Sequence, residues 1–89
     1  WLAKPSANVV ATIGDGGMQI NIQELQTIAV NKIPIKIFIL NNRCYGNIMH
    51  PAREMFEGRT HATEPGMGYE APDFVKIGRA YGIPSTKVV

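Results

Sequence analysis

The pattern of apolar and polar positions divides the first half of the chain into a strand, a helix and a second strand. The run at residues 8–13 is apolar and rich in β-branched side chains, and it stops at residues 14–17 (GDGG), so we expect a buried strand and then a tight turn. Apolar residues then recur three or four positions apart over residues 18–31, which predicts one amphipathic helix. The almost continuously apolar run at residues 35–40 predicts a second strand, of the kind that parallel sheets cover on both faces.

A strand, a helix and a strand in this order form a βαβ unit, whose two strands run parallel. The chain is therefore expected to have an α/β fold, with part of an open parallel sheet flanked by helices. We interpret residues 1–89 as the central fragment of one such domain. The loops that follow the two strands should meet at the carboxyl edge of the sheet, where ligands bind in open α/β folds.

The second half of the chain carries weaker signals. It predicts a short helix at residues 52–56 and then an irregular loop at residues 59–71. A capped helix at residues 73–82 and the start of a strand at residues 86–89 are expected to follow. Gly58 is expected to end the short helix. Asp73 is a good N-cap for the later helix, and Gly82 lies where a C-terminal glycine belongs.

Composition and charge exclude several classes of protein. Hydrophobic residues make up 45% and charged residues 18%, values typical of a folded α/β protein rather than a disordered tail. A net charge of +2 without a run of Lys and Arg does not suggest a nucleic-acid partner. The single cysteine, Cys44, excludes an internal disulfide and fits a reducing compartment such as the cytoplasm. No apolar run approaches the roughly 18 residues of a membrane span.

The residues that carry chemistry follow the two predicted strands. Asp15 lies in the first loop and supplies a carboxylate, and Asn42 in the second loop supplies an amide oxygen. The first loop leads into a helix N-terminus, whose free amides favour a phosphate group. A cation is needed between that phosphate and Asp15, and an all-oxygen set suits Mg²⁺ or Ca²⁺. Each motif alone is also a common turn or strand end, but the βαβ geometry brings the two to one edge.

The spacing of these motifs resembles the signature of thiamine-diphosphate-dependent enzymes. GDG at residues 14–16 is followed, after 24 intervening residues, by NN at residues 41–42. The segments GDGGMQINIQEL and ILNNRCYG resemble the large subunit of acetolactate synthase (acetohydroxyacid synthase). So does PDFV leading into AYG near the end of the chain.

The resemblance implies a set of site residues. Mg²⁺ would be held by the Asp15 carboxylate, the side-chain oxygen of Asn42 and the main-chain carbonyl of Cys44. Thiamine diphosphate would be bound by the same two loops, through Gly14, Asp15, Gly16, Gly17, Asn42, Tyr45, Gly46 and Asn47. The resemblance assigns no catalytic residue to this chain, because the glutamate that activates the cofactor lies in another domain of such enzymes. The isolated fragment is therefore expected to be inactive.

The implied reaction is the decarboxylation of a 2-oxo acid such as pyruvate and the joining of the product to a second 2-oxo acid, in branched-chain amino acid biosynthesis. The full-length parent is expected to be a homodimer or homotetramer with the cofactor at the subunit interface, and a requirement for FAD is left open. Gly17 stands where most relatives have a small hydroxyl residue, and Pro51 stands near the place of a tryptophan that shapes the acceptor site. Thiamine-diphosphate-dependent decarboxylases and oxidases of 2-oxo acids therefore stay open. So does, in a different class, a non-catalytic regulatory domain that binds a nucleotide or phosphate.

Overall fold

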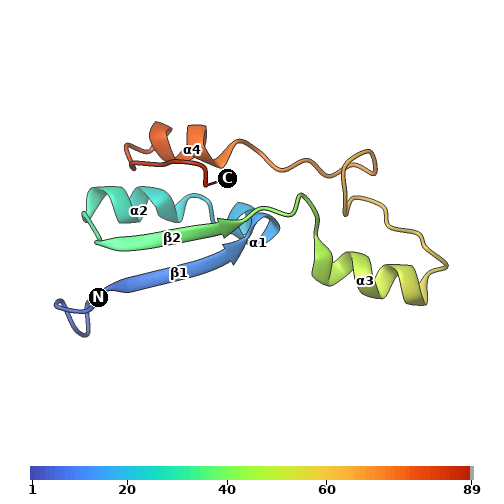
Figure 1. The fold of residues 1–89 in the computed structure, drawn as a ribbon, viewed down its shortest axis with the longest axis horizontal. Helices are drawn as coiled ribbons and strands as arrows, with labels where there is room; N and C mark the ends of the chain where they lie inside the picture. Colours follow the sequence, from blue (N-terminus) through green and yellow to red (C-terminus); the bar gives the residue numbers. More distant parts are fainter. Residues whose placement is uncertain (89) are drawn as a thin grey trace.

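Two parallel strands form the sheet within residues 1–88, the part of the chain that the structure, a computed structural model, describes (Figure 1). β1 spans Val9–Gly14 and β2 spans Ile35–Leu40. They pair in parallel, with Val9 opposite Ile35 and Gly14 opposite Leu40. The predicted α/β class and parallel pairing are thus confirmed. β1 begins one residue later than expected and extends through Gly14.

Two short helices connect the strands, where the sequence predicted a tight turn and one longer helix. α1 (Asp15–Ile20) begins directly after β1, because Gly14 is still extended (φ −73°, ψ 160°) and Asp15 is already helical. Asn21 then leaves the helical conformation (φ −128°, ψ 38°), and α2 (Glu24–Val30) follows. Between the two helices the backbone hydrogen bonds join residues three positions apart. For example, the Glu24 amide donates to the Asn21 carbonyl at 3.0 Å. Asparagine is a poor helix former, which favours a break at this position.

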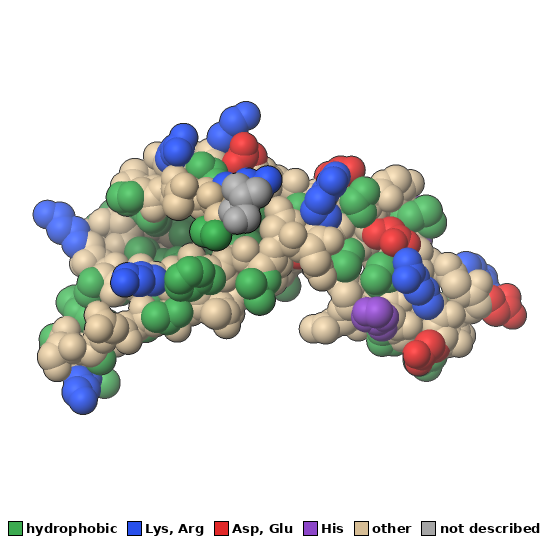
Figure 2. Space-filling model, viewed as in Figure 1, with side chains coloured by type: hydrophobic (Ala, Val, Ile, Leu, Met, Phe, Trp, Pro, Cys, Tyr) green, Lys and Arg blue, Asp and Glu red, His purple; other side chains and the backbone are tan. Residues whose placement is uncertain are grey.

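The helices cover one face of the sheet. Side chains alternate along each strand, and a hollow on the covered face is lined by residues of both strands and both helices, among them Ala11, Ile13, Met18, Leu25, Ile28, Ile35 and Ile37. The other face is open to solvent: Val10 is 54%, Phe38 49% and Leu40 65% exposed. Figure 2 shows hydrophobic side chains gathered over the strands on this side. The expectation that both faces are covered is therefore wrong within residues 1–88.

α3 (Gly46–Met55) extends away from the sheet and is longer than the short helix predicted near residues 52–56 (Figure 1). Pro51 lies inside it, although proline removes one helical hydrogen bond. The helix ends as expected near Gly58, whose amide donates to the Arg53 carbonyl at 3.1 Å. No helix within residues 1–88 is long and apolar enough to cross a membrane.

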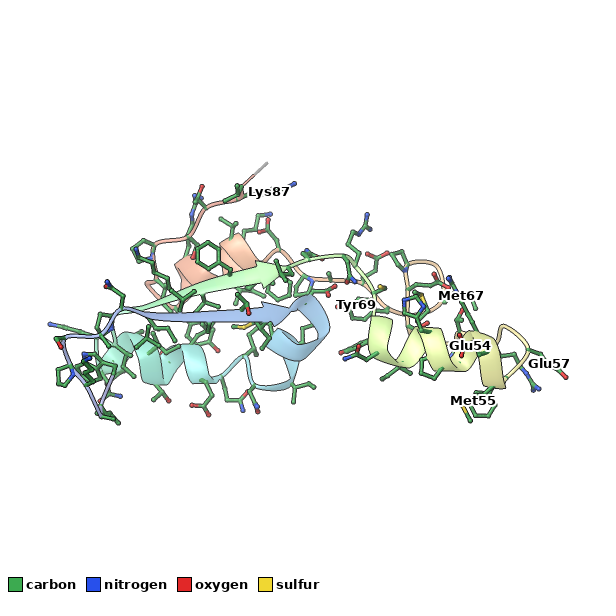
Figure 3. All side chains as sticks on the ribbon, turned by 60° about the horizontal axis from the view of Figure 1, so that its bottom comes forward. Glu54, Met55, Glu57, Met67, Tyr69 and Lys87 are labelled. Atoms are coloured by element: carbon green, nitrogen blue, oxygen red, sulfur yellow. The ribbon has the colours of Figure 1, made fainter. Side chains whose placement is uncertain are left out.

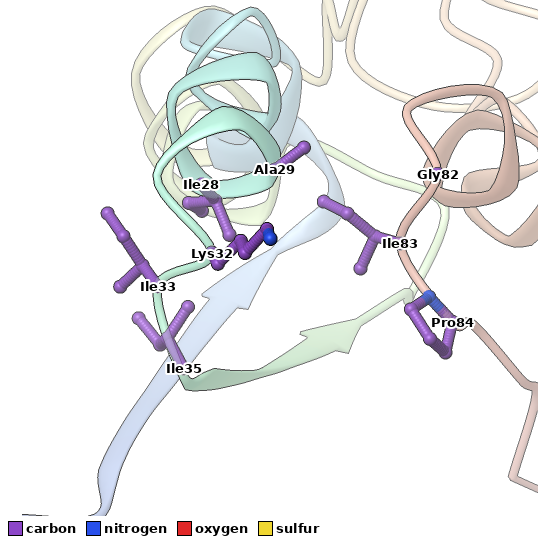
Figure 4. Close-up of a pocket in the computed structure, with 8 residues that line it drawn as sticks. All are labelled: Ile28, Ala29, Lys32, Ile33, Ile35, Gly82, Ile83 and Pro84. Atoms are coloured by element: carbon purple, nitrogen blue, oxygen red, sulfur yellow. The ribbon is translucent and has the colours of Figure 1, made fainter.

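α4 (Phe74–Ala80) has the caps that the sequence predicted. The Asp73 carboxylate accepts from the amides of Val75 and Lys76, both at 3.0 Å. Gly82 adopts a left-handed φ of +75°, and the next amide donates back to the Gly78 carbonyl at 2.9 Å. This turn aims Ile83 at the end of α2 (Figure 4). The strand expected at residues 86–89 is not formed over residues 86–88, which have no sheet partner, and Val89 lies outside the described residues.

Candidate metal and diphosphate site

The parallel register places the two sequence motifs at the same edge of the sheet. Gly14 pairs with Leu40 at the carboxyl ends of the strands, so Asp15 and Asn41 follow from neighbouring positions. Residues 41–45 lead from β2 into α3, while α1 starts from β1 without a loop. The expected meeting of the two motifs at this edge is what the structure shows.

Asp15 is the one buried acidic side chain within residues 1–88, with 1% of its surface exposed. The Tyr69 hydroxyl donates to its Oδ2 at 2.9 Å. Among the described residues no Lys, Arg or His forms an ion pair with Asp15, and none donates a hydrogen bond to its Oδ1. No buried side-chain N or O atom of the described residues lacks a hydrogen-bond partner, so Oδ1 keeps some accessible surface and is the carboxylate oxygen that could accept a cation.

Tyr69 reaches Asp15 from the loop between α3 and α4. It is 6% exposed, and its hydroxyl oxygen accepts from Gln19 Nε2 at 2.9 Å. Burial first, and then the hydrogen bond to Asp15, raise the pKa of Tyr69 to about 12. The hydroxyl is therefore protonated at neutral pH and acts as the donor to the carboxylate. Figure 3 shows Tyr69 between the end of the sheet and α3.

Tyr45 joins the second motif to the first. Its ring lies 4.4 Å from that of Tyr69, between centroids, at an interplanar angle of 58°. A Cβ atom on Gly16 would overlap this ring. Neither Gly16 nor Gly17 has a positive φ. Glycine at position 16 is therefore required because it leaves space for the Tyr45 ring, and not because the backbone adopts a left-handed turn.

The loop after β2 is shaped by its own asparagines. Asn41 Oδ1 accepts from the amide of Arg43 at 3.1 Å, and Asn42 Oδ1 accepts from the amide of Cys44 at 3.2 Å. Arg43 between them has a left-handed φ of +58°. The Asn42 oxygen keeps a second lone pair for another partner. Gly46 and Asn47 begin α3, so their amides belong to its first turn.

The structure thus brings some of the expected site residues into direct contact and leaves others as neighbours. Asp15 and Gly16 contact the pair formed by Tyr69 and Tyr45, whereas Asn42 and Cys44 contact each other within their own loop. No cluster of three or more His, Cys, Asp or Glu suited to a metal occurs among the described residues. The set expected here has one carboxylate, one amide oxygen and one main-chain carbonyl, so such a cluster is not required.

Sequence reasoning missed two residues of this site. Gln19 lies four residues after Asp15 on the same helix, a spacing that puts both on one face. Its role would have been visible had the helix been predicted to begin at Asp15. Tyr69 lies in an irregular loop 54 positions from Asp15, and no local pattern marks it.

Comparison with known proteins identifies the class to which this site belongs. The whole chain, residues 1–89, matches the family described as thiamine pyrophosphate enzyme, C-terminal TPP binding domain. The chain belongs to this family of thiamine-diphosphate-binding domains. The predicted fold family and cofactor class are confirmed.

Individual relatives are named for two different activities of this family. The chain is 39% identical over 88 residues to a probable acetolactate synthase large subunit of Methanocaldococcus jannaschii, covering 99% of the chain and 14% of that protein. It is also 39% identical over 87 residues to the acetolactate synthase large subunit of Porphyra purpurea, covering 98% of the chain and 14% of that protein. Among solved structures, a thiamine diphosphate-dependent 4-hydroxybenzoylformate decarboxylase of Rhodococcus jostii RHA1 is 37% identical with a TM-score of 0.79, over 98% of the chain and 16% of that protein. The chain thus spans about one seventh of the length of these relatives.

Proposed function

We propose that the protein carrying this chain is a thiamine-diphosphate-dependent enzyme that decarboxylates a 2-oxo acid such as pyruvate and joins the product to a second 2-oxo acid. The observation that carries the proposal is the buried Asp15 carboxylate, which lacks a cationic partner among the described residues at the carboxyl edge of the sheet. The relatives named acetolactate synthase support the reaction type.

The roles of the site residues follow from their chemistry. Asp15, the Asn42 side-chain oxygen and the Cys44 main-chain carbonyl would hold Mg²⁺, and diphosphate oxygens and water would complete its shell. Backbone amides of Gly16, Gly17, Gly46 and Asn47, in the first turns of α1 and α3, would bind the diphosphate, with Gly14 and Tyr45 beside them. Thiamine diphosphate, when bound, supplies the electron sink for decarboxylation.

This chain binds and orients the cofactor but contributes no catalytic residue in the proposal. The isolated chain would therefore be inactive. The proposal for the intact protein includes a homodimer or homotetramer with the cofactor at the interface. A requirement for FAD stays open, and the flavin absorbance of the intact enzyme tests it. It also places the protein in the cytoplasm.

The test of the metal role is Asp15→Asn in the intact protein. The substitution keeps the shape of the side chain and removes the charge that faces the cation. We expect Mg²⁺-dependent binding of thiamine diphosphate, measured by quenching of intrinsic fluorescence, to weaken about 100-fold, from the ~3 kcal/mol that removing one partner of a buried charge pair costs.

The matched control is Glu24→Gln, which neutralises an exposed acid in the first turn of α2 that makes no hydrogen bond with Asp15 or Tyr69 among the described residues. It should bind the cofactor as the native protein does. Unchanged binding in Asp15→Asn would contradict the metal role. Equal quenching by ADP and by thiamine diphosphate would instead favour a nucleotide-binding regulatory domain.

A second reaction has specific support. The similar solved structure is a decarboxylase, and its identity to the chain is close to that of the acetolactate synthase relatives. Incubating the intact enzyme with pyruvate and with aryl 2-oxo acids distinguishes the two. Acetolactate as the product supports the synthase, and an aldehyde as the only organic product supports the decarboxylase.

A further inference from the structure

A tyrosine from a distant loop contacts the proposed metal-binding carboxylate. Tyr69 lies in the irregular segment between α3 and α4, and its hydroxyl is 2.9 Å from Asp15 Oδ2. Both side chains are buried, with exposed fractions of 6% and 1%. This contact joins two parts of the chain that the sheet does not connect (Figure 3).

The direction of the hydrogen bonds is set by chemistry. The Gln19 amide nitrogen can only donate, so the Tyr69 oxygen accepts from it and the Tyr69 proton goes to Asp15. Asp15 Oδ2 is thereby occupied, while Oδ1 has no donor among the described residues. One oxygen is held by the protein, and the other remains for a cation.

We propose that Tyr69 is a positioning residue, which holds Asp15 through Oδ2 so that Oδ1 binds the metal. The inference rests on the proposed function, because it requires a metal at Asp15. Carboxylates that bind metals are generally oriented by a second hydrogen-bonding group, and losing that group typically costs 10- to 100-fold in metal affinity.

The loop that carries Tyr69 is itself attached to the second motif. The Tyr45 amide donates to the Thr63 carbonyl at 2.8 Å, and Arg43 forms an exposed ion pair with Glu70 at 3.2 Å. Glu64 accepts from the Thr60 hydroxyl within the loop at 2.8 Å and forms an ion pair with Arg53 of α3 at 3.0 Å. Residues 59–71 therefore contact both segments that carry the proposed metal ligands. By reciprocity, metal binding should in turn stabilise the attachment of this loop.

The experiment is a titration of the intact protein with Mn²⁺ in the presence of thiamine diphosphate, followed by electron paramagnetic resonance of free Mn²⁺. Tyr69→Phe removes only the hydroxyl and keeps the ring beside Tyr45. We expect its Mn²⁺ dissociation constant to rise about tenfold or more. Excess Mg²⁺ should restore the activity of this variant, since a higher metal concentration compensates for a weaker metal affinity.

The control is Tyr81→Phe, because the hydroxyl of Tyr81 at the end of α4 has no hydrogen-bond partner among the described residues. Its Mn²⁺ affinity should equal that of the native protein. Gln19→Met is a second variant, which removes the donor to Tyr69 and leaves the tyrosine in place. We expect a weakening of about 2- to 10-fold, the value of one neutral hydrogen bond.

A purely structural role would give a different result. Hydrogen exchange should show that Mn²⁺ and thiamine diphosphate protect the amides of residues 59–71 in the native protein and no longer do so in Tyr69→Phe. Unchanged or tighter Mn²⁺ binding by Tyr69→Phe would overturn the inference, as would equal protection of the loop. If Asp15→Asn also keeps native Mn²⁺ affinity, the proposed metal site itself is wrong. If Asp15→Asn loses the metal and Tyr69→Phe does not, only the role of Tyr69 fails.

Discussion

At the scale of single residues, the glycines after β1 follow a different backbone path from the predicted one. A GDGG run after a strand predicts a tight turn. The structure instead continues into α1, and Gly16 leaves room for the Tyr45 ring. The motif was still correctly placed at the sheet edge, because that placement depends on the end of the strand.

Gly16→Ala tests this use of the glycine. The added Cβ would overlap the Tyr45 ring, so the ring must move and its contact with Tyr69 is lost. We expect the free energy of unfolding, measured with urea in the intact protein, to fall by about 1–3 kcal/mol, as for other overpacked sites.

Gly14→Ala is the matched control, because a Cβ at Gly14 meets no atom within 4 Å and its φ of −73° suits any residue. Its near-ultraviolet circular dichroism from tyrosine should match that of the native protein. An unaltered tyrosine signal in Gly16→Ala would show that the ring is not held against Gly16.

At the scale of elements, the helix with clear capping signals was predicted close to its observed bounds, and the other helices were predicted only in part. α4 was recognised from Asp73 and Gly82, which act through bonds within the helix and its ends. The break between α1 and α2 was missed. The backbone hydrogen bonds at this break join residues three positions apart and turn the chain almost as an α-helix does. The spacing of apolar residues is therefore the same on both sides of the break, and the sequence gives no sign of it. α3 was predicted too short, since Pro51 disfavours helix at the residue before it.

Asp73→Ala should weaken α4 in a measurable way. The side chain accepts from two amides that otherwise have no helical partner. Losing this cap costs about 1 kcal/mol, which corresponds to roughly fivefold faster exchange of amides that open with the helix. Hydrogen exchange of residues 75–80 in the intact protein measures this, and Asp73→Ser, which keeps a capping oxygen, should exchange as the native protein does. Equal rates in the alanine variant would mean that packing alone holds α4.

At the scale of the whole molecule, the 89-residue chain has an open shape. Its radius of gyration is 15.7 Å, compared with about 12 Å for a compact domain of this length. α3 and the loop after it project beyond the sheet (Figure 1). One face of the sheet is left uncovered, with Phe38 at its centre beside Val10 and Leu40.

The chain expressed alone is therefore expected to self-associate through this face, since monomers rarely expose continuous apolar patches. Sedimentation velocity at micromolar concentrations should show dimers or larger species. Phe38→Lys places a charge in the patch and should shift the population towards monomer. Val30→Lys changes an equally apolar, 66% exposed residue on α2 and should leave association as it is. A monomeric native chain would contradict the expectation.

The sequence by itself determined the strand pair, the capped helix and the location of Asp15 and Asn42 at one edge. These features depend on hydrophobic period, on end signals such as Asp73, and on the parallel geometry of a βαβ unit, all of which act over short stretches of chain. Only the tertiary structure decided which residues surround Asp15. The contact with Tyr69 links positions 54 apart through an irregular loop, and its formation depends on packing against Tyr45 and Gly16 rather than on any local pattern.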